Sequence, residues 1–131
     1  MSPHASVMEA VERMMEQHVG AIAVVDDDQL LGVFTERDLM TRVVARGKDP
    51  SSTRISEVMT RNVYAVSDHT PVAAAAALMR ANHFRHLPVV DDAGRLCGMV
   101  ALRYLLYDLM DHYEMKMDDL ERYMMEDSRG G

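Results

Sequence analysis

Apolar and polar residues follow the same order twice along this chain. A stretch with helical spacing of apolar residues begins at Val7, and a short apolar strand, an acidic turn and a second strand follow it. Superposing Val7 on Val72 aligns this stretch with a second one of the same order. The pattern predicts helix, hairpin and helix, built twice, and each unit is expected to bury its apolar face against its twin.

In the first copy, the spacing predicts a helix from Val7 to His18 with Ser6 as its N-cap, and strands at 21–25 and 30–34. The acidic run between the strands, 26–29, lacks the spaced acids and glycine of a calcium loop, so it is interpreted as a hairpin turn.

In the second copy, Thr70 is the expected N-cap, and strands are expected at 86–90 and 95–100. A lone strand is predicted at 63–66, ahead of this copy. The first copy has no counterpart to it, so either the native chain starts upstream or the protein does without that strand.

These elements predict an α+β fold of two pseudo-symmetric units with short mixed sheets, followed by a long C-terminal helix. The first unit is expected at 1–48, the second at 49–106, and the acidic C-terminal helix and tail at 107–131. Apolar residues recur in that helix at heptad spacing: Leu106, Met110, Tyr113, Met117, Leu120 and Met124. This seam favours a subunit contact, with packing on its own domain as the alternative.

Composition excludes several classes of protein. The chain has 131 residues, 48% of them hydrophobic, and a net charge of −7, which argues against disorder and against nucleic-acid binding. Cys97 is the only cysteine, which excludes an internal disulfide and favours a reducing, cytoplasmic location. Its mid-strand position predicts an inert, buried thiol. No apolar run is long enough to cross a membrane, so we expect a soluble protein with no membrane partner.

Thr35 and Asp38 carry the clearest chemistry. Thr35 ends a predicted strand, and Asp38 lies in the first turn of the helix that follows. A carboxylate there can accept hydrogen bonds from two adjacent ribose hydroxyls. The same spacing is a capping box, and the two roles are compatible. In the second copy Ala101 and Tyr104 replace the hydroxyl and the carboxylate.

Three stretches carry a family likeness: Val58-Met59-Thr60-Arg61, Phe84-Arg85-His86-Leu87-Pro88-Val89-Val90-Asp91 and Gly32-Val33-Phe34-Thr35-Glu36-Arg37-Asp38. Each half resembles a CBS domain, the regulatory module of cystathionine β-synthase, and residues 2–107 resemble a tandem CBS pair. The resemblance implies two units related by a pseudo-twofold axis. It also implies two clefts that can hold adenine nucleotides or related adenosyl ligands, and dimerisation of the pair.

Carried onto this chain, the resemblance implies one working cleft with three groups of residues. They are Thr35 and Asp38 for ribose, Arg85, His86 and Arg103 for phosphate, and Val33, Val63 and Tyr64 as the adenine wall. In the other cleft, small neutral residues, Gly20 and Ala21, stand where Arg85 and His86 stand in the second copy.

We therefore expect a regulatory module that senses AMP, ADP or ATP and signals through a homodimer or an unidentified protein partner. The alternatives are a non-binding dimerisation or scaffold domain, or a binder of S-adenosylmethionine or NAD(H). No catalytic residues and no required cofactor are predicted. No metal site is predicted either, because the histidines recur at matching positions in both copies, which favours a framework role.

Overall fold

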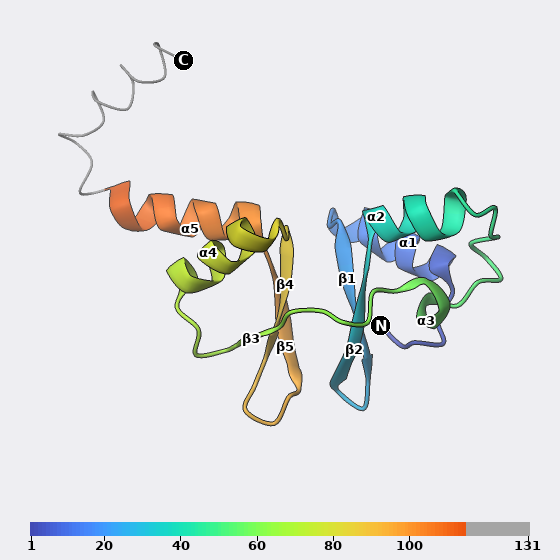
Figure 1. Cartoon of the computed structure of the whole chain (residues 1–131), viewed down its shortest axis with the longest axis horizontal. Helices are drawn as coiled ribbons and strands as arrows, with labels where there is room; N and C mark the ends of the chain where they lie inside the picture. Colours follow the sequence, from blue (N-terminus) through green and yellow to red (C-terminus); the bar gives the residue numbers. More distant parts are fainter. Residues whose placement is uncertain (115–131) are drawn as a thin grey trace, which may run out of the picture.

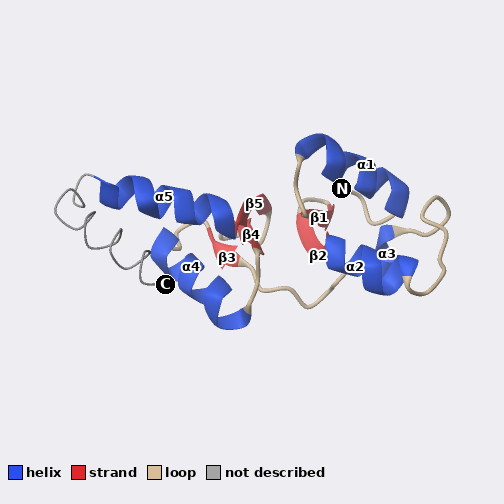
Figure 2. Cartoon of the chain, turned by 90° about the horizontal axis from the view of Figure 1, so that it is seen from above, coloured by secondary structure: helices blue, strands red, loops and turns tan. Residues whose placement is uncertain are grey.

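The protein was analysed as a computed structural model that describes residues 1–114. Two β-hairpins lie next to each other in the middle of the molecule (Figure 1). Helices α4 and α5 lie outside one hairpin, and α1, α2 and α3 lie outside the other (Figure 2). The predicted arrangement of two similar units is confirmed, and both belong to a mixed α and β fold.

The first unit follows the predicted order closely. Its elements are α1 (Val7–Gln17), β1 (Ala21–Asp26), β2 (Gln29–Thr35), α2 (Glu36–Asp38) and the π-helical segment η1 (Leu39–Val44). A short helix that was not predicted, α3 (Ile55–Val58), follows and packs against the same core. Ser6 caps α1 as predicted, because its Oγ accepts a hydrogen bond from the Glu9 amide at 3.1 Å. The hairpin turn is also confirmed: Asp27 and Asp28 have φ of 49° and 64°, the positive values that a two-residue type I′ turn requires.

The second unit departs from prediction at its start. Its elements are β3 (Val66–Ser67), α4 (Val72–Asn82), β4 (His86–Val90), β5 (Leu96–Ala101) and α5 (Leu102–Glu114). Of the strand predicted at 63–66, only Val66 lies in a strand, the two-residue β3, which pairs in parallel with β4. The predicted cap Thr70 is wrong, because its amide is held in a turn by the Ser67 carbonyl at 3.0 Å. The adjacent Pro71, whose ring leaves it no N–H to donate, takes the N-cap position.

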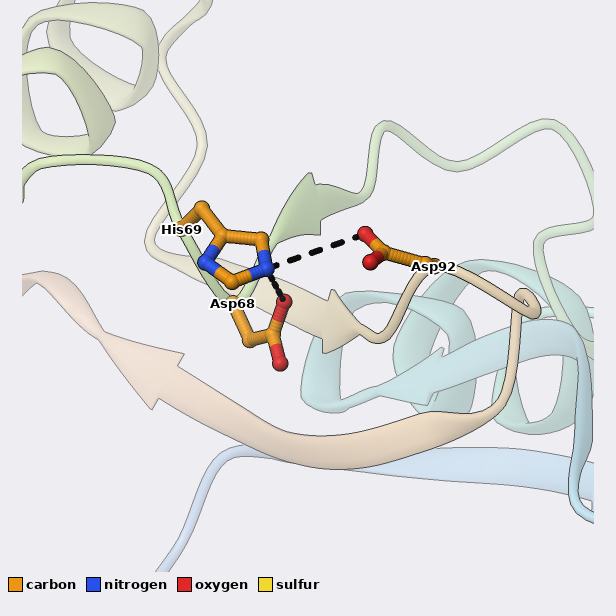
Figure 3. A group of neighbouring side chains, drawn as sticks. All are labelled: Asp68, His69 and Asp92. Atoms are coloured by element: carbon orange, nitrogen blue, oxygen red, sulfur yellow. Dashed lines mark ion pairs between the residues drawn. The ribbon is translucent and has the colours of Figure 1, made fainter.

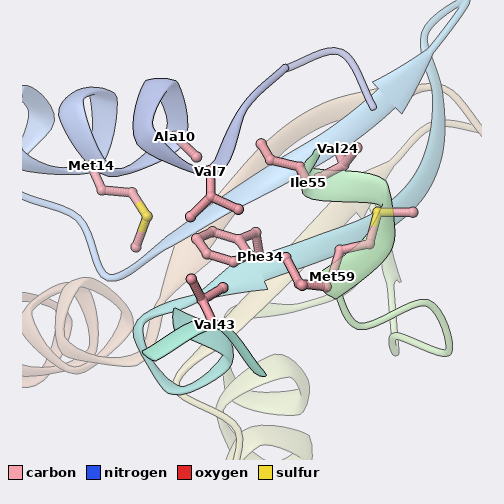
Figure 4. Close-up of a cluster of buried hydrophobic side chains, with 9 residues drawn as sticks. Val7, Ala10, Met14, Val24, Phe34, Val43, Ile55 and Met59 are labelled. Carbon is pink, nitrogen blue, oxygen red and sulfur yellow. The ribbon is translucent and has the colours of Figure 1, made fainter. Parts of the chain in front are cut away.

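Each unit has its own apolar core. The core of the first unit surrounds the fully buried Phe34, whose burial contributes about 1.5–3 kcal/mol, and it is drawn in Figure 4. Ile55, Val58 and Met59 belong to this core, and the Ile55 amide donates to the Ala5 carbonyl at 2.9 Å. The core of the second unit is smaller: Val66, Ala75, Met79, Leu87 and Leu105. The boundary between 48 and 49 stays a prediction.

Met1 lies beside β1 much as Val66 lies beside β4. The Val25 amide donates to the Met1 carbonyl at 2.9 Å, and the Met1 amine donates to the Ala23 carbonyl at 3.0 Å. Burial, assisted by the charge of Arg13, lowers the pKa of this amine. Met1 thus provides part of the pairing that the first copy lacks in its sequence pattern.

Backbone contacts join the two units at the hairpin tips and along the linker, which is the segment between α3 and β3 (residues 59–65). The Leu96 amide donates to the Asp28 carbonyl at 2.9 Å, next to a bridge between Gln29 and Arg95. The linker crosses β2, where Thr60 and Val33 exchange two backbone hydrogen bonds of 2.9 Å. These contacts place the β2–α2 junction of one unit opposite the β5–α5 junction of the other.

The described part of α5 exposes the start of the predicted heptad seam. Leu106 and Met110 are 48% and 65% exposed. The C-terminal helix predicted from residue 107 is, up to Glu114, a continuation of α5, and residues 115–131 lie outside the described residues. Within residues 1–114, no helix combines the length and the apolar character that a membrane crossing needs.

Candidate functional site

An open groove of about 960 Å³ lies between the two units. The end of α1 and the β2–α2 junction form one wall, and the start of β4 and the β5–α5 junction form the other. Its polar side chains include Arg85, His86 and Arg103, so the structure brings together the three residues predicted to contact phosphate. The rest of the lining is mostly apolar: Val11, Met14, Met15, Val19, Leu39, Ala101, Leu102 and Leu106.

Short backbone hydrogen bonds fix the two walls of the groove in the same way. In the second unit the Leu102 amide donates to the Arg85 carbonyl at 2.8 Å. In the first unit the Glu36 amide donates to the Gly20 carbonyl at 3.0 Å. Each bond ties the start of a helix to the residue that precedes a strand. Arg85 and Gly20 therefore hold matching positions, and only the second unit places a cation there.

Arg103 spans the groove. Its Nη2 donates to the His18 carbonyl of the first unit at 3.1 Å and to the Tyr104 hydroxyl at 3.3 Å. The guanidinium carbon lies 4.9 Å from the centre of the Tyr104 ring. His18 ends α1 in the left-handed conformation with φ of 54°, at the point where the chain leaves the helix. Arg103 thus links the two units directly.

His86 is half-buried beside both arginines. Loss of hydration is the largest cause that lowers its pKa, and the positive charges of Arg103 and Arg85 act in the same direction. Glu36 opposes them, because its negative charge raises the pKa of His86. Sequence reasoning missed Glu36 as a groove residue, although it lies inside the motif of Thr35 and Asp38.

Asp38 is only 5% exposed, and its carboxylate is engaged within the protein. Its Oδ2 accepts from the Thr35 amide at 3.0 Å, while the Thr35 hydroxyl accepts from the Asp38 amide at 3.1 Å. The capping box is therefore confirmed. Thr60 donates its hydroxyl to Oδ1 at 3.0 Å, and the Nε of Arg42 lies 3.6 Å from the same oxygen.

Thr35 and Asp38 do not line the 960 Å³ groove. They adjoin it through Glu36, so their role toward ribose stays a prediction. Thr60 and Arg42 were not foreseen as partners of Asp38. Thr60 lies in the family-like stretch at 58–61, but its contact with Asp38 depends on the path of the linker across β2.

The residues predicted as an adenine wall are spread over the linker side of the molecule. Val33 is buried, and its backbone is paired with Thr60. Tyr64 is 55% exposed, and its ring centre lies 5.3 Å from that of Phe84. Val63, which directly precedes Tyr64, is partly exposed. None of the three lines the groove, and their role also stays a prediction.

The prediction of a buried Cys97 is wrong. The thiol is exposed, and no residue of β5 is fully buried. Partial loss of hydration, together with the carboxylates of Asp68 and Asp91, raises the pKa of this thiol.

Comparisons with known proteins agree with the fold and the duplicated pattern. The family model of the CBS domain matches residues 1–45 and 55–111. An uncharacterised protein of Methanopyrus kandleri is 35% identical over 106 residues, which cover 80% of this chain and 54% of the relative. The chain thus spans about half the length of that relative.

Solved structures with CBS domains share the fold as well. A putative signal-transduction protein with CBS domains from Burkholderia ambifaria has a TM-score of 0.76 at 34% identity, covering 84% of this chain and 80% of that one. The crystal structure of CBSX2 in complex with AMP has a TM-score of 0.71 at 28% identity, covering 85% of this chain and 86% of that one.

Proposed function

Because this chain belongs to the CBS-domain family and carries two such units, we propose that it is a regulatory module that binds an adenine nucleotide between them. The observation that carries the proposal is the cluster of Arg85, His86 and Arg103 on one wall of an otherwise largely apolar groove. Planar guanidinium groups with fixed charge suit phosphate oxygens, and the β2–α2 junction in the facing wall leads directly to Thr35 and Asp38. The AMP complex of CBSX2 supports the choice of ligand class.

In the proposed complex the phosphate takes hydrogen bonds from Arg85 and Arg103. Arg103 then exchanges its bond to the His18 carbonyl for a charge-assisted bond to the ligand, which is the stronger of the two. Glu36 repels additional negative charge at the same place, and we infer that AMP binds more tightly than ATP.

The ribose hydroxyls donate to Asp38, and the base lies toward Val33, Val63 and Tyr64. A carboxylate has about four acceptor positions, and Asp38 already uses several of them for Thr35 and Thr60. Ribose binding therefore requires Thr60 or Arg42 to withdraw from the carboxylate. This rearrangement links the ligand to the linker, which joins the two units.

A ligand regulates only by binding one arrangement of the units more tightly than another. Release of the His18 carbonyl by Arg103 supplies such a difference, because that bond joins the two units. The change is passed to a homodimer partner or another protein through the helices, whose exposed apolar residues include Met15, Met40, Val44, Leu106, Tyr107 and Met110.

Calorimetric titration of the full chain with AMP, ADP and ATP tests this function. Arg85→Ala should weaken AMP binding by about 10- to 100-fold, the effect of losing a hydrogen bond to a charged group. Arg37→Ala is the matched control, because Arg37 is the first-unit counterpart of Arg103 and does not line the groove. Failure of all three nucleotides to bind would overturn the proposal.

Two related hypotheses have distinct outcomes in the same experiment. S-adenosylmethionine or NAD(H) binding in place of AMP, with the same loss in Asp38→Asn, would identify another adenosyl ligand. The exposed apolar helix residues favour a second candidate, a dimerisation or scaffold domain without a ligand. In that case no adenosyl compound binds, and Leu106→Glu with Met110→Glu converts a dimer to a monomer.

A further inference from the structure

Three side chains that can bind a metal meet at the end of β4 opposite to the groove. Asp68 and His69 directly follow β3, and Asp92 lies just after β4 (Figure 3). Because β3 and β4 run in parallel, their carboxyl ends lie at the same edge of the sheet. The parallel pairing therefore brings His69 next to an aspartate that is distant in the sequence.

The spacing of the three groups is that of metal ligands. His69 Nε2 lies 3.4 Å from Asp68 Oδ1 and 3.8 Å from Asp92 Oδ1. One ligand atom from each residue lies within 4.8 Å of the other two. Bond lengths near 2.1 Å in a tetrahedral zinc site place neighbouring ligand atoms about 3.4 Å apart. The separations of 3.4 and 3.8 Å are close to this value, so one cation can contact all three side chains after small shifts.

Local hydrogen bonds hold the backbone of this cluster in place. The Asp68 amide donates to the Val90 carbonyl at 3.0 Å, and the His69 amide donates to the Ser67 hydroxyl at 3.0 Å. In the β4–β5 turn, Asp91 Oδ1 accepts from the amides of Ala93 and Arg95 at 2.9 Å. Asp91 thus fixes the turn, and its neighbour Asp92 extends toward His69.

We propose that Asp68, His69 and Asp92 form a binding site for a divalent transition-metal cation such as Zn²⁺, separate from the nucleotide groove. One imidazole nitrogen and two carboxylates are ligands that zinc accepts, and water completes the coordination because the side chains of His69 and Asp92 are 74% and 88% exposed. Mg²⁺ and Ca²⁺ prefer all-oxygen sites with more ligands. The sequence analysis predicted no metal site, because His69 and Asp92 become neighbours only through the parallel pairing.

The bound cation ties the segment that leads into α4 to the β4–β5 turn. It therefore stabilises the second unit, whose apolar core is the smaller one. The first unit lacks the full set, because Pro3, His4 and Asp27 stand where the second has Asp68, His69 and Asp92. His4 is accordingly the natural control residue.

Calorimetric titration of the full, untagged chain with ZnCl₂, beside a titration with MgCl₂, tests the site. We expect one Zn²⁺ per chain at this site, a higher melting temperature with Zn²⁺, and no matching effect of Mg²⁺. His69→Gln and Asp92→Asn should each weaken zinc binding at least about tenfold, because mutation of residues that only hydrogen-bond to metal ligands already costs about tenfold or more in affinity. His4→Gln should bind zinc as the parent does.

The result that overturns the site is zinc binding unchanged by His69→Gln and Asp92→Asn, or no zinc binding by the parent chain. A loss equal in His4→Gln and His69→Gln also overturns it, because it would indicate nonspecific capture by surface histidines. Circular dichroism of each variant without metal shows that it is folded. AMP binding should be the same in His69→Gln as in the parent, so failure of the metal site and failure of the nucleotide site are distinguishable.

Discussion

Gly32 and Gly98 hold matching positions in the two units, yet their surroundings differ sharply. A Cβ on Gly32 would lie 2.5 Å from the Thr60 carbonyl oxygen and 3.1 Å from the Met59 sulfur. A Cβ on Gly98 would meet no atom within 4 Å among the described residues. The linker crosses β2 of the first unit at close range, and no described segment crosses β5 of the second unit in that way.

This difference matches the different roles proposed for the two units in nucleotide binding. The crossing that requires Gly32 also places the Thr60 hydroxyl on Asp38, so the first unit holds its carboxylate in a closed, hydrogen-bonded setting. The second unit presents Arg85, His86 and Arg103 in an open groove. The two copies of the unit therefore differ: one holds a buried acid, and the other presents accessible bases.

The largest expected effect comes from filling the crossing. Gly32→Ala forces the new methyl group against the Thr60 carbonyl, which is held in place by the two backbone hydrogen bonds between Thr60 and Val33. We expect a loss of up to about 3 kcal/mol in the free energy of unfolding. Gly98→Ala, its matched control, should change that free energy by no more than about 0.5 kcal/mol. Urea unfolding of both variants measures the difference. Equal losses would mean that the crossing does not constrain the first unit.

Removal of the Asp38 charge should have the next largest effect. In Asp38→Asn an amide nitrogen replaces one acceptor oxygen among the Thr35 and Thr60 donors, so we expect a loss of about 2 kcal/mol in unfolding free energy. Tyr104→Phe removes the hydroxyl at the matching position of the second unit, where the side chain is exposed, and should be close to neutral. A neutral Asp38→Asn would contradict the structural role of the carboxylate.

Most local features of the fold could be predicted from the sequence, with the Thr70 cap as an exception, and most long-range contacts could not. The Ser6 cap, the turn at Asp27 and the box of Thr35 with Asp38 involve residues close in the sequence, and all three are confirmed. The gathering of Arg85, His86 and Arg103 followed from the family likeness.

What the sequence could not provide depends on how distant segments pack. The Thr60 contact to Asp38 depends on the path of the linker, and the contact of Arg103 with His18 depends on how the two units pack. Cys97 was misplaced because its apolar neighbours suggested a buried strand, whereas no residue of β5 is fully buried. Residue patterns describe faces of elements, but not which faces other segments cover.

The pH dependence of stability should distinguish the basic half from its counterpart. Since the folded protein lowers the pKa of His86 below its value of 6.5, the folded state disfavours the protonated ring. The associated stability is present above pH 6.5 and is lost as the pH falls through the lowered pKa of the folded state. The parent should lose more stability than His86→Gln between about pH 7 and pH 5 in urea unfolding.

A bound phosphate should reverse this effect. An anion beside His86 favours its protonated form, so AMP affinity should rise on acidification in the parent and rise less in His86→Gln. If AMP affinity depends on pH in the same way in the parent and in His86→Gln, protonation of His86 does not contribute to AMP binding.

The smallest expected effect concerns the link between the units. Arg103→Ala removes the hydrogen bond to the His18 carbonyl, and because this contact is exposed we expect no more than about 1 kcal/mol in unfolding free energy. Amide hydrogen exchange at the end of α1 should report the change more sensitively, since the His18 and Val19 amides close the last turn onto Met14 and Met15. Arg37→Ala, at the matching position, should leave that exchange unaltered. Faster exchange in Arg103→Ala alone would mean that Arg103 holds the two units together when no ligand is bound. Binding of a phosphate by Arg103 would then necessarily perturb the contact between the units. Equal exchange rates in Arg103→Ala and Arg37→Ala would mean that Arg103 does not hold the two units together and acts only through the ligand.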